Sequence, residues 1–230
     1  DGHNNTATCN ATVTVSDATP PTAVCKNATV NLSGNSASIT AAQINNGSTD
    51  NCGTVNLVGV SPNSFTCADI GANTVTLTVS DGHNNTATCT ATVTVSDATL
   101  PTAVCQNAMV NLSGNSASVT AVQINNGSTD NCGTVNLVGV SPNSFTCSDI
   151  GANTVTLTVN DGHGNTATCT ATVTVSDATP PTAVCQNATV EIQANEQGTI
   201  AASAINDGSS DNCGIQNLAL NRTTFDCADL

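Results

Sequence analysis

The sequence predicts an all-β protein, a tandem array of small antiparallel β-sandwich repeats that disulfides stabilise. Three observations support this fold class. The chain of 230 residues repeats itself with a period of 80. Within a repeat, apolar residues alternate with threonines over whole segments, and the cysteines recur at the same places in each copy. Self-similarity at a fixed period is the signature of a repeat architecture.

The repeat divides the chain into four parts. The sequence Asp-Gly-His-x-Asn-Thr-Ala-Thr-Cys begins at Asp1, Asp81 and Asp161, and residues 17–96 match residues 97–176 at 72 of 80 positions. The expected parts are the C-terminal strands of a repeat (1–16), two whole repeats (17–96 and 97–176) and a diverged repeat without its last two strands (177–230). We therefore expect the chain to be a piece of a longer protein.

The clearest strands are two segments of strict alternation, which is the pattern of a half-buried β-strand. Thr74–Ser80 and Thr86–Ser96 each place apolar residues on one face and mostly threonines on the other. Residues 81–85 between them are turn formers, so the two strands should form a hairpin.

Shorter strands are expected upstream, at Thr22–Leu32, Ala37–Thr40 and Thr54–Val60. Turn-forming residues separate them. In the first of these strands, Cys25 is out of phase with the apolar face that contains Val30, so we expect a bulge or a change of sheet near Lys26 or Asn27. No window of ten residues has a helical period.

Each complete repeat has four cysteines at recurring positions: Cys25, Cys52, Cys67 and Cys89, then Cys105, Cys132, Cys147 and Cys169. Even numbers of cysteines at fixed spacing are typical of a disulfide framework in an oxidising compartment. The alternative is zinc, which favours Cys-x-x-Cys pairs, and the sequence has none. We therefore predict disulfides and an extracellular location at the cell surface.

Composition excludes several functions. The chain has two basic residues, Lys26 and Arg222, against sixteen acidic ones. Nucleic acids and anionic membranes are excluded as partners because both are bound through clustered Lys or Arg, and direct membrane insertion is not expected. An enzyme is not expected either. The sequence has no paired nucleophile and base, no phosphate-binding glycine loop and no distinctive pair of acids.

Three motifs resemble those of a known family. They are Asp-x-x-Pro-Pro-x-x-x-Cys at Asp17–Cys25, Thr-Asp-Asn-Cys-Gly at Thr49–Gly53, and Asp-Gly-x-x-Asn-x-Ala-x-Cys-x-x-x-Val-x-Val at Asp81–Val95. The chain resembles HYR-type repeats, which are immunoglobulin-like modules of cell-surface proteins. The extra cysteine of Asp-Asn-Cys-Gly resembles the repeats of giant surface proteins of Bacteroidetes, most of all the SprB-type gliding-motility adhesins, which the type IX system exports. The resemblance covers all 230 residues and implies an immunoglobulin-like sandwich.

The resemblance also implies a disulfide pattern. In the family, the cysteine of the first strand pairs with that of the last, which implies Cys25–Cys89 and Cys105–Cys169. The remaining pairs would be Cys52–Cys67, Cys132–Cys147 and Cys213–Cys227. Closing loops of 64 and 15 residues in this way stabilises a repeat by about 4 and about 3 kcal/mol on a chain-entropy estimate. A bond between repeats, Cys89–Cys105, is the alternative. Cys9 and Cys185 are expected to lack partners within the chain.

The acidic loops are candidate calcium ligands. If the first strand runs away from the linker, the loop with Asp50 and Asn51 returns to the linker end, beside Asp17 and the hairpin tip at Asp81. Calcium takes six to eight oxygen ligands from such groups. The candidates at the repeat junctions are Asp17, Asp50, Asn51, Asp81, Asp97, Asp130, Asn131 and Asp161, together with Asp69 from the opposite end of its repeat. The alternative is that these residues only form turns, and no other cofactor is expected.

The sequence favours a structural role. We expect a stalk or filament segment of an extracellular bacterial surface adhesin, for surface attachment or gliding motility. Its expected partners are neighbouring repeats of the same chain, with surface polysaccharide or substratum bound through other parts of the protein. The alternatives are an array of glycan-binding modules and a surface-layer component. Glycan sites usually expose aromatic side chains, and the sequence has no Trp and no Tyr.

Overall fold

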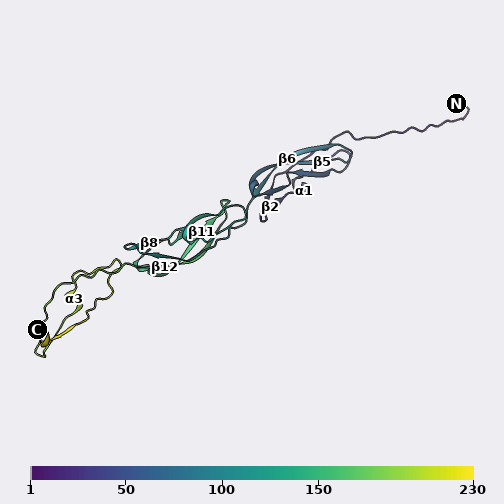
Figure 1. The fold of residues 1–230 in the computed structure, drawn as a ribbon. Coiled ribbons are helices and arrows are strands. Elements are labelled where there is room, and N and C mark those ends of the chain that lie inside the picture. Colours follow the sequence, from purple (N-terminus) through teal and green to yellow (C-terminus); the bar gives the residue numbers. More distant parts are fainter. Residues whose placement is uncertain (1) are drawn as a thin grey trace. The chain divides into compact units, whose positions relative to one another are not determined.

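The computed structural model describes residues 2–230, which form two compact units. The first unit contains the chain up to Leu100 together with Asp130–Thr134, and the second contains Pro101–Thr129 and Val135–Leu230. The loop Asp130–Thr134 therefore belongs to the second repeat by sequence and to the first unit by its contacts. The chain is all-β, as predicted, with tandem sandwich-like repeats (Figure 1), and the helices among residues 2–230 are single turns.

The repeat in the first unit has six strands in two sheets. In chain order its elements are β1 (Ala28–Asn31), β2 (Ser36–Ser38), α1 (Ala41–Ile44), β3 (Asn56–Ser61), β4 (Ser64–Thr66), the 3₁₀ turn η1 (Cys67–Asp69), β5 (Gly71–Ser80) and β6 (Thr86–Ser96). One sheet has the order β1-β6-β5-β3, and β2 pairs with β4 in the other. Only the β1–β6 pair is parallel.

The predicted hairpin is formed by β5 and β6, which lie side by side (Figure 1) and pair from Gly71 opposite Val95 to Ser80 opposite Thr86. Its apolar face is the core of the repeat. The three apolar side chains of β5 at alternate positions, Val75, Leu77 and Val79, are fully buried. Phe65 of β4 and Ile44 of α1 pack in the same cluster. Burial of each such side chain contributes roughly 1.5–3 kcal/mol, so the alternating pattern is the main source of stability apart from the disulfides.

The predicted change of sheet in the first strand is confirmed. Thr22 and Cys25 form isolated bridges with Thr49 and Asn45, whereas the next stretch, Ala28–Asn31, pairs with β6. The pairing partner therefore changes between Cys25 and Ala28. The expected continuous strand Thr22–Leu32 is instead two short pieces on different partners.

The helical turn α1 was not expected from the sequence. Its signal is short: Thr40 precedes the turn, and Gln43 lies three residues later, which is the spacing of a capping box. The Thr40 backbone N–H donates to Gln43 Oε1 at 2.8 Å. A turn of four residues is too short to show a helical period, so only this capping signal could have revealed it.

The second unit repeats the same design. Its elements are β7 (Ala108–Asn111), β8 (Ser116–Ser118), α2 (Ala121–Ile124), β9 (Asn136–Ser141), β10 (Ser144–Thr146), η2 (Cys147–Asp149), β11 (Gly151–Asn160) and β12 (Thr166–Ser176), followed by β13 (Gln197–Thr199), α3 (Ala202–Ile205), β14 (Thr224–Asp226) and η3 (Cys227–Asp229). The main sheet has the order β7-β12-β11-β9, and β13 pairs with β14 in the diverged repeat.

The segment 1–16 differs from its expectation. Asp1 lies outside the described residues, and residues 2–16 form no strand. In the complete repeat, the equivalent strand β6 is paired on both sides, by β1 and β5. Residues 6–16 match β6 in sequence, but no described strand pairs with them, so no ladder of hydrogen bonds holds them extended.

Candidate functional site

Two disulfides close individual repeats. Cys25–Cys89 and Cys105–Cys169 are both formed, each with a Cα–Cα distance of 5.8 Å. Cys25 lies where the first strand changes sheet, and Cys89 lies on β6 opposite Leu77. The bond therefore ties the irregular start of the repeat to its central hairpin.

The other two disulfides join consecutive repeats, and we call them the junction disulfides. They are Cys67–Cys132 and Cys147–Cys213, with Cα–Cα distances of 5.2 and 5.3 Å. The predicted pairs Cys52–Cys67, Cys132–Cys147 and Cys213–Cys227 are therefore wrong, and the alternative Cys89–Cys105 is not formed either. Cys9, Cys52, Cys185 and Cys227 form no disulfide among the described residues and are exposed.

Strand geometry explains the correction. Cys52 precedes β3 and Cys67 follows it by way of β4, so β3 carries the chain from one end of the repeat to the other. Its six residues span about 20 Å at about 3.3 Å each. Disulfide-bonded cysteines need Cα atoms within about 7 Å. Proximity in the sequence is therefore misleading, because a strand separates the two cysteines.

The loop Asp130–Thr134 is held in the first unit by more than its disulfide. Asn131 Nδ2 donates to the Gly34 carbonyl at 2.7 Å, in the turn between β1 and β2. The Cys132 N–H donates to Asp130 Oδ2 at 2.9 Å. Cys132 is 9% exposed and packs in the core cluster of the first unit. The Asp-Asn-Cys motif thus orders its own loop and contacts the preceding repeat.

The same contacts recur in the second unit. Asn212 Nδ2 donates to the Gly114 carbonyl at 2.8 Å, and the Cys213 N–H donates to Asp211 Oδ2 at 2.9 Å. Gly114 is the residue equivalent to Gly34 one period later. Recurrence in a diverged repeat indicates that the motif Asp-Asn-Cys-Gly specifies this contact. Its recurrence is the one sequence signal from which a role between repeats could have been predicted.

Two aspartates and a histidine converge at the linker end of the first repeat. One ligand atom each from Asp17, Asp81 and His83 lie within 4.8 Å of one another. Asn85 Nδ2 bridges the group, because it donates to the Asp17 carbonyl at 3.1 Å and to Asp81 Oδ2 at 2.6 Å.

Asp50 belongs to the same end of the repeat. The carboxylate of Asp17, burial and then the carboxylate of Asp50 raise the pKa of the Cys52 thiol, with a smaller contribution from Asp81. All three carboxylates thus contribute to the raised pKa of the Cys52 thiol. Asp50 Oδ2 accepts from the Cys52 N–H at 2.8 Å, whereas Asn51 is exposed and donates to Cys52 Sγ at 3.2 Å.

Several acidic-loop oxygens are buried and accept no hydrogen bond from any described residue. They are Asp17 Oδ2, Asp50 Oδ1, Asp130 Oδ1, Asn131 Oδ1, Asp211 Oδ1 and Asn212 Oδ1. Buried acceptors of this kind normally have a partner, either protein, water or ion. Such oxygens recur at the Asp-Asn pair of successive repeats. The loops therefore share buried acceptor oxygens that lack a hydrogen-bond donor among residues 2–230.

Other predicted ligands have local roles. Asp69 Oδ2 accepts from the Thr66 N–H at 2.7 Å and from the Thr66 hydroxyl at 3.0 Å, so it caps η1. Asp97 is buried, and its Oδ1 accepts from the Thr99 N–H at 3.0 Å. Asp161 accepts from the His163 N–H at 2.8 Å and from Asn165 Nδ2 at 2.6 Å, which orders its hairpin tip. These contacts are those of turn and cap formers.

The hydrogen bonds to Asp81 predict a pH dependence. Burial opposes ionisation, but the His83 N–H and the Asn85 side chain and N–H donate to the carboxylate, and together they hold the pKa of Asp81 below its usual range. A carboxyl with a lowered folded-state pKa stabilises the fold at neutral pH, and this contribution is lost as the pH falls below about 4. Urea unfolding between pH 7 and pH 2 should show a shallower acid loss for Asp81→Asn than for the unmodified chain. Asp207→Asn, at an exposed loop position, should leave the curve unchanged, and equal acid losses in all three proteins would contradict the assignment.

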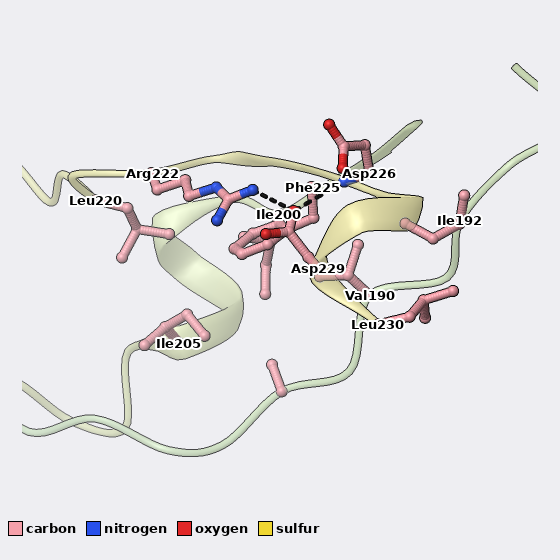
Figure 2. A pocket seen from close by; sticks show the side chains of 11 residues that line it. Val190, Ile192, Ile200, Ile205, Leu220, Arg222, Phe225, Asp226, Asp229 and Leu230 are labelled. Atoms are coloured by element: carbon pink, nitrogen blue, oxygen red, sulfur yellow. Dashed lines mark hydrogen bonds and ion pairs between the residues drawn. The ribbon is translucent and has the colours of Figure 1, made fainter. Parts of the chain in front are cut away.

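A cavity of about 360 Å³ in the diverged repeat does not have the character of a ligand site. Figure 2 shows Val190, Ile192, Ile200 and Ile205 around it, with the ion pair of Arg222 and Asp229 at one side. These four apolar residues are equivalent to the core residues Val30, Leu32, Ile39 and Ile44. In the first repeat β5 and β6 cover those positions, and residues 177–230 contain no equivalent of either strand. The cavity is therefore an open core.

The helices of the described residues are single turns of the chain, and none has the length and apolar character to cross a membrane.

Comparisons with known proteins agree with the repeat organisation. The family model described as HYR domain matches residues 16–95 and 96–175. Hyalin of Strongylocentrotus purpuratus is 34% identical over 191 residues, a match that covers 77% of this chain and 16% of hyalin. The chain thus spans about a sixth of the length of that relative.

Two of the matching solved structures have low overall similarity to the chain. Human mucin-like protocadherin EC1-2 is 16% identical, with 54% of this chain and 84% of that chain covered and a TM-score of 0.29. The titin domains I67–I69 are 11% identical, with 71% and 68% covered and a TM-score of 0.30.

Proposed function

We propose that the chain, which belongs to the HYR domain family, is a structural stalk segment of an extracellular adhesin. An oxidising, extracellular location agrees with its four disulfides. The finer assignment, to a bacterial surface adhesin that serves attachment or gliding motility, rests on the extra cysteine of Asp-Asn-Cys-Gly. Surface polysaccharide or substratum would be bound through other parts of the whole protein.

The junction disulfides carry this proposal. A module that binds or catalyses through a site within one domain does not need a covalent bond to the next domain. Cys67–Cys132 and Cys147–Cys213 instead bond each repeat to its successor, in addition to the peptide linker. Such a bond is useful where the connection itself must withstand load, as in a stalk between a cell surface and a bound target.

A deletion of one full period tests the stalk in the whole protein. Removal of residues 97–176 brings Cys213 to the sequence distance from Cys67 that Cys132 now has, within one residue, so the junction disulfide can form again. We expect cells that carry the shortened protein to adhere as before. A matched deletion of half a period breaks the spacing between the cysteines of the junction disulfide and should reduce adhesion. Loss of adhesion after the full-period deletion would contradict a purely structural role.

The alternative of glycan binding has a direct test. A glycan array probed with the full chain should show no binding in the micromolar range, since the sequence has no Trp and no Tyr. Reproducible micromolar binding that survives reduction of the repeat number to one would favour the glycan-binding array instead.

We further propose that Ca²⁺ binds the acidic loops. In the first repeat, buried oxygens of Asp17 and Asp50 lack a donor among the described residues, and Asp81 lies close by. In the second unit, Asp177 and Asp211 line a cavity of about 390 Å³ beside the Cys147–Cys213 bond. The chain has only two basic residues to balance its sixteen acids, and Ca²⁺ favours carboxylate oxygens. A bound cation would be the missing partner of these buried oxygens.

Calcium should then raise the melting temperature of the chain. A ligand at 100 times its Kd adds about 2.7 kcal/mol to stability, which for repeats of this size is roughly 10–20 °C. Differential scanning calorimetry in excess Ca²⁺ and in excess chelator measures the difference. Asp50→Asn with Asp211→Asn should reduce the shift, and Asp207→Asn should preserve it. An unchanged melting temperature would mean that the aspartates only form turns.

A further inference from the structure

We propose that the four disulfides give the chain two separate covalent routes for tension, so that either route alone limits its extension. The bonds overlap in sequence, because each bond after the first begins before the previous one ends. In chain order they are Cys25–Cys89, Cys67–Cys132, Cys105–Cys169 and Cys147–Cys213. Every peptide bond between Cys25 and Cys213 is spanned by at least one of them. This property goes beyond a role as an adhesin stalk and does not depend on what the whole protein binds.

The first route uses the bonds within repeats. Tension enters at Cys25, crosses to Cys89, follows the backbone through the proline linker to Cys105, and crosses to Cys169. The backbone between Cys89 and Cys105 is sixteen residues long. All of β2, β3, β4 and β5 lie outside this route.

The second route uses the junction disulfides. Tension crosses from Cys67 to Cys132, follows the backbone for fifteen residues to Cys147, and crosses to Cys213. This route contains β9 and β10 but neither strand of the central hairpin. It shares no residue with the first route, because residues 89–105 and 132–147 do not overlap.

Each route shortens the extensible chain several-fold. A fully extended chain gains about 3.6 Å per residue, so a free repeat of 80 residues could reach about 290 Å. Fifteen or sixteen residues and one disulfide reach only about 60 Å. Unfolding of a repeat therefore releases little length, and the loss of one route leaves the other in place.

The exposed cysteines mark the two ends of the second route in this chain. Cys52 is equivalent to Cys132 and Cys213, and Cys227 is equivalent to Cys67 and Cys147. Neither has a disulfide partner among the described residues. In the experiments below, both are replaced by serine together with Cys9 and Cys185, so that exposed thiols cannot join molecules to one another.

The test is the maximum extension of the full chain, held at its two termini through peptide tags in single-molecule force spectroscopy. With all four disulfides we expect about 300 Å between the ends, because the shortest covalent path uses Cys25–Cys89, the backbone between Cys89 and Cys67, and then the two junction disulfides. Serine at Cys67, Cys132, Cys147 and Cys213 should leave about 375 Å, because the first route remains. Serine at Cys25, Cys89, Cys105 and Cys169 should leave about 360 Å, because the second route remains. Only the removal of all eight cysteines should release about 820 Å, a rise of more than twofold.

The variant without the repeat-closing bonds is decisive. Local pairs such as Cys52–Cys67 and Cys132–Cys147 would leave most of its backbone free, so an extension above about 600 Å before reduction would overturn the proposal. Cys52 is restored in that variant to allow the local pair. A thiol count under denaturing conditions verifies which bonds each variant contains.

A second measurement does not require the cysteine variants of the repeat core to fold. A specific protease site is placed in the linker between Asp97 and Leu100, which only Cys67–Cys132 spans. After cleavage the chain should run as one species on a non-reducing denaturing gel and as two after reduction. The matched control, with serine at Cys67 and Cys132, should separate without reduction. Separation of the unmodified chain without reductant would overturn the proposal.

Discussion

Replacement of Cys25 and Cys89 by alanine should lower the free energy of unfolding of the first repeat by about 4 kcal/mol. The bond closes a loop with a sequence separation of 64, and a cross-link of this length removes much of the conformational entropy of the unfolded chain. A domain of 80 residues has a total stability of roughly 4–12 kcal/mol. The pair therefore contributes roughly a third or more of the stability of the first repeat.

Hydrogen exchange of β5 and β11 gives this measurement with an internal reference. Exchange of the amides of β5 should become faster by about a thousandfold, whereas β11, in the repeat with an intact Cys105–Cys169 bond, should exchange at its original rate. Cys52→Ala is the matched control, because Cys52 is exposed and forms no bond among the described residues. A change below about 1 kcal/mol in the double variant would contradict the entropic argument.

Phe65→Ala should cost the first repeat about 3–5 kcal/mol. Phe65 is 2% exposed, and it lies on β4 opposite Ala37 of β2, where the small sheet covers the hairpin. It is the single aromatic residue of the repeat. Its loss leaves a cavity in a core of Val, Leu and Ile, which contains no second aromatic side chain to fill the space.

Phe225 provides the matched control. It occupies the equivalent place in the diverged repeat, where it lines the open core and is only partly buried. Phe225→Ala should therefore cost clearly less than Phe65→Ala in denaturant unfolding under non-reducing conditions. Equal costs at the two positions would mean that the hairpin does not complete the core around Phe65.

The fold was largely predictable because the alternation of residues reports directly on burial. Val75, Leu77 and Val79 lie on the buried face of β5 as predicted, since a two-residue period leaves no other choice of face. The change of sheet near Lys26 was also predictable, from one cysteine out of phase. The turn α1 was not, because four residues are too few for a helical period.

The disulfide pattern was predictable only in part. The resemblance to HYR-type repeats implies the pair Cys25–Cys89, and the structure contains this bond. The pair Cys52–Cys67 is only what remains in a repeat once Cys25 and Cys89 are paired, and it conflicts with the expected positions of Asp50 and Asp69 at opposite ends of the repeat. The same geometry, applied to the cysteines, excludes the local pair. Which cysteine of the next repeat meets Cys67 depends on the docking of the Asp-Asn-Cys loop, which no pattern within one repeat encodes.

The acidic loops show a similar division. Convergence of Asp17, Asp50 and Asp81 followed from the direction of the strands. The role of Asp69 as a cap of η1 did not, because a carboxylate at that position fits a turn cap and a calcium ligand equally well.

A disulfide map tests the junction disulfides most directly. A protease that cleaves before aspartate releases residues 50–68, 130–148 and 211–225 as separate peptides, and the first two differ only by Ala68 against Ser148 after otherwise identical sequence. Mass spectrometry without reduction should find these three peptides joined in one species, through Cys67–Cys132 and Cys147–Cys213. Residues 50–68 released alone with an internal bond, and residues 211–225 joined to 226–228, would contradict the account.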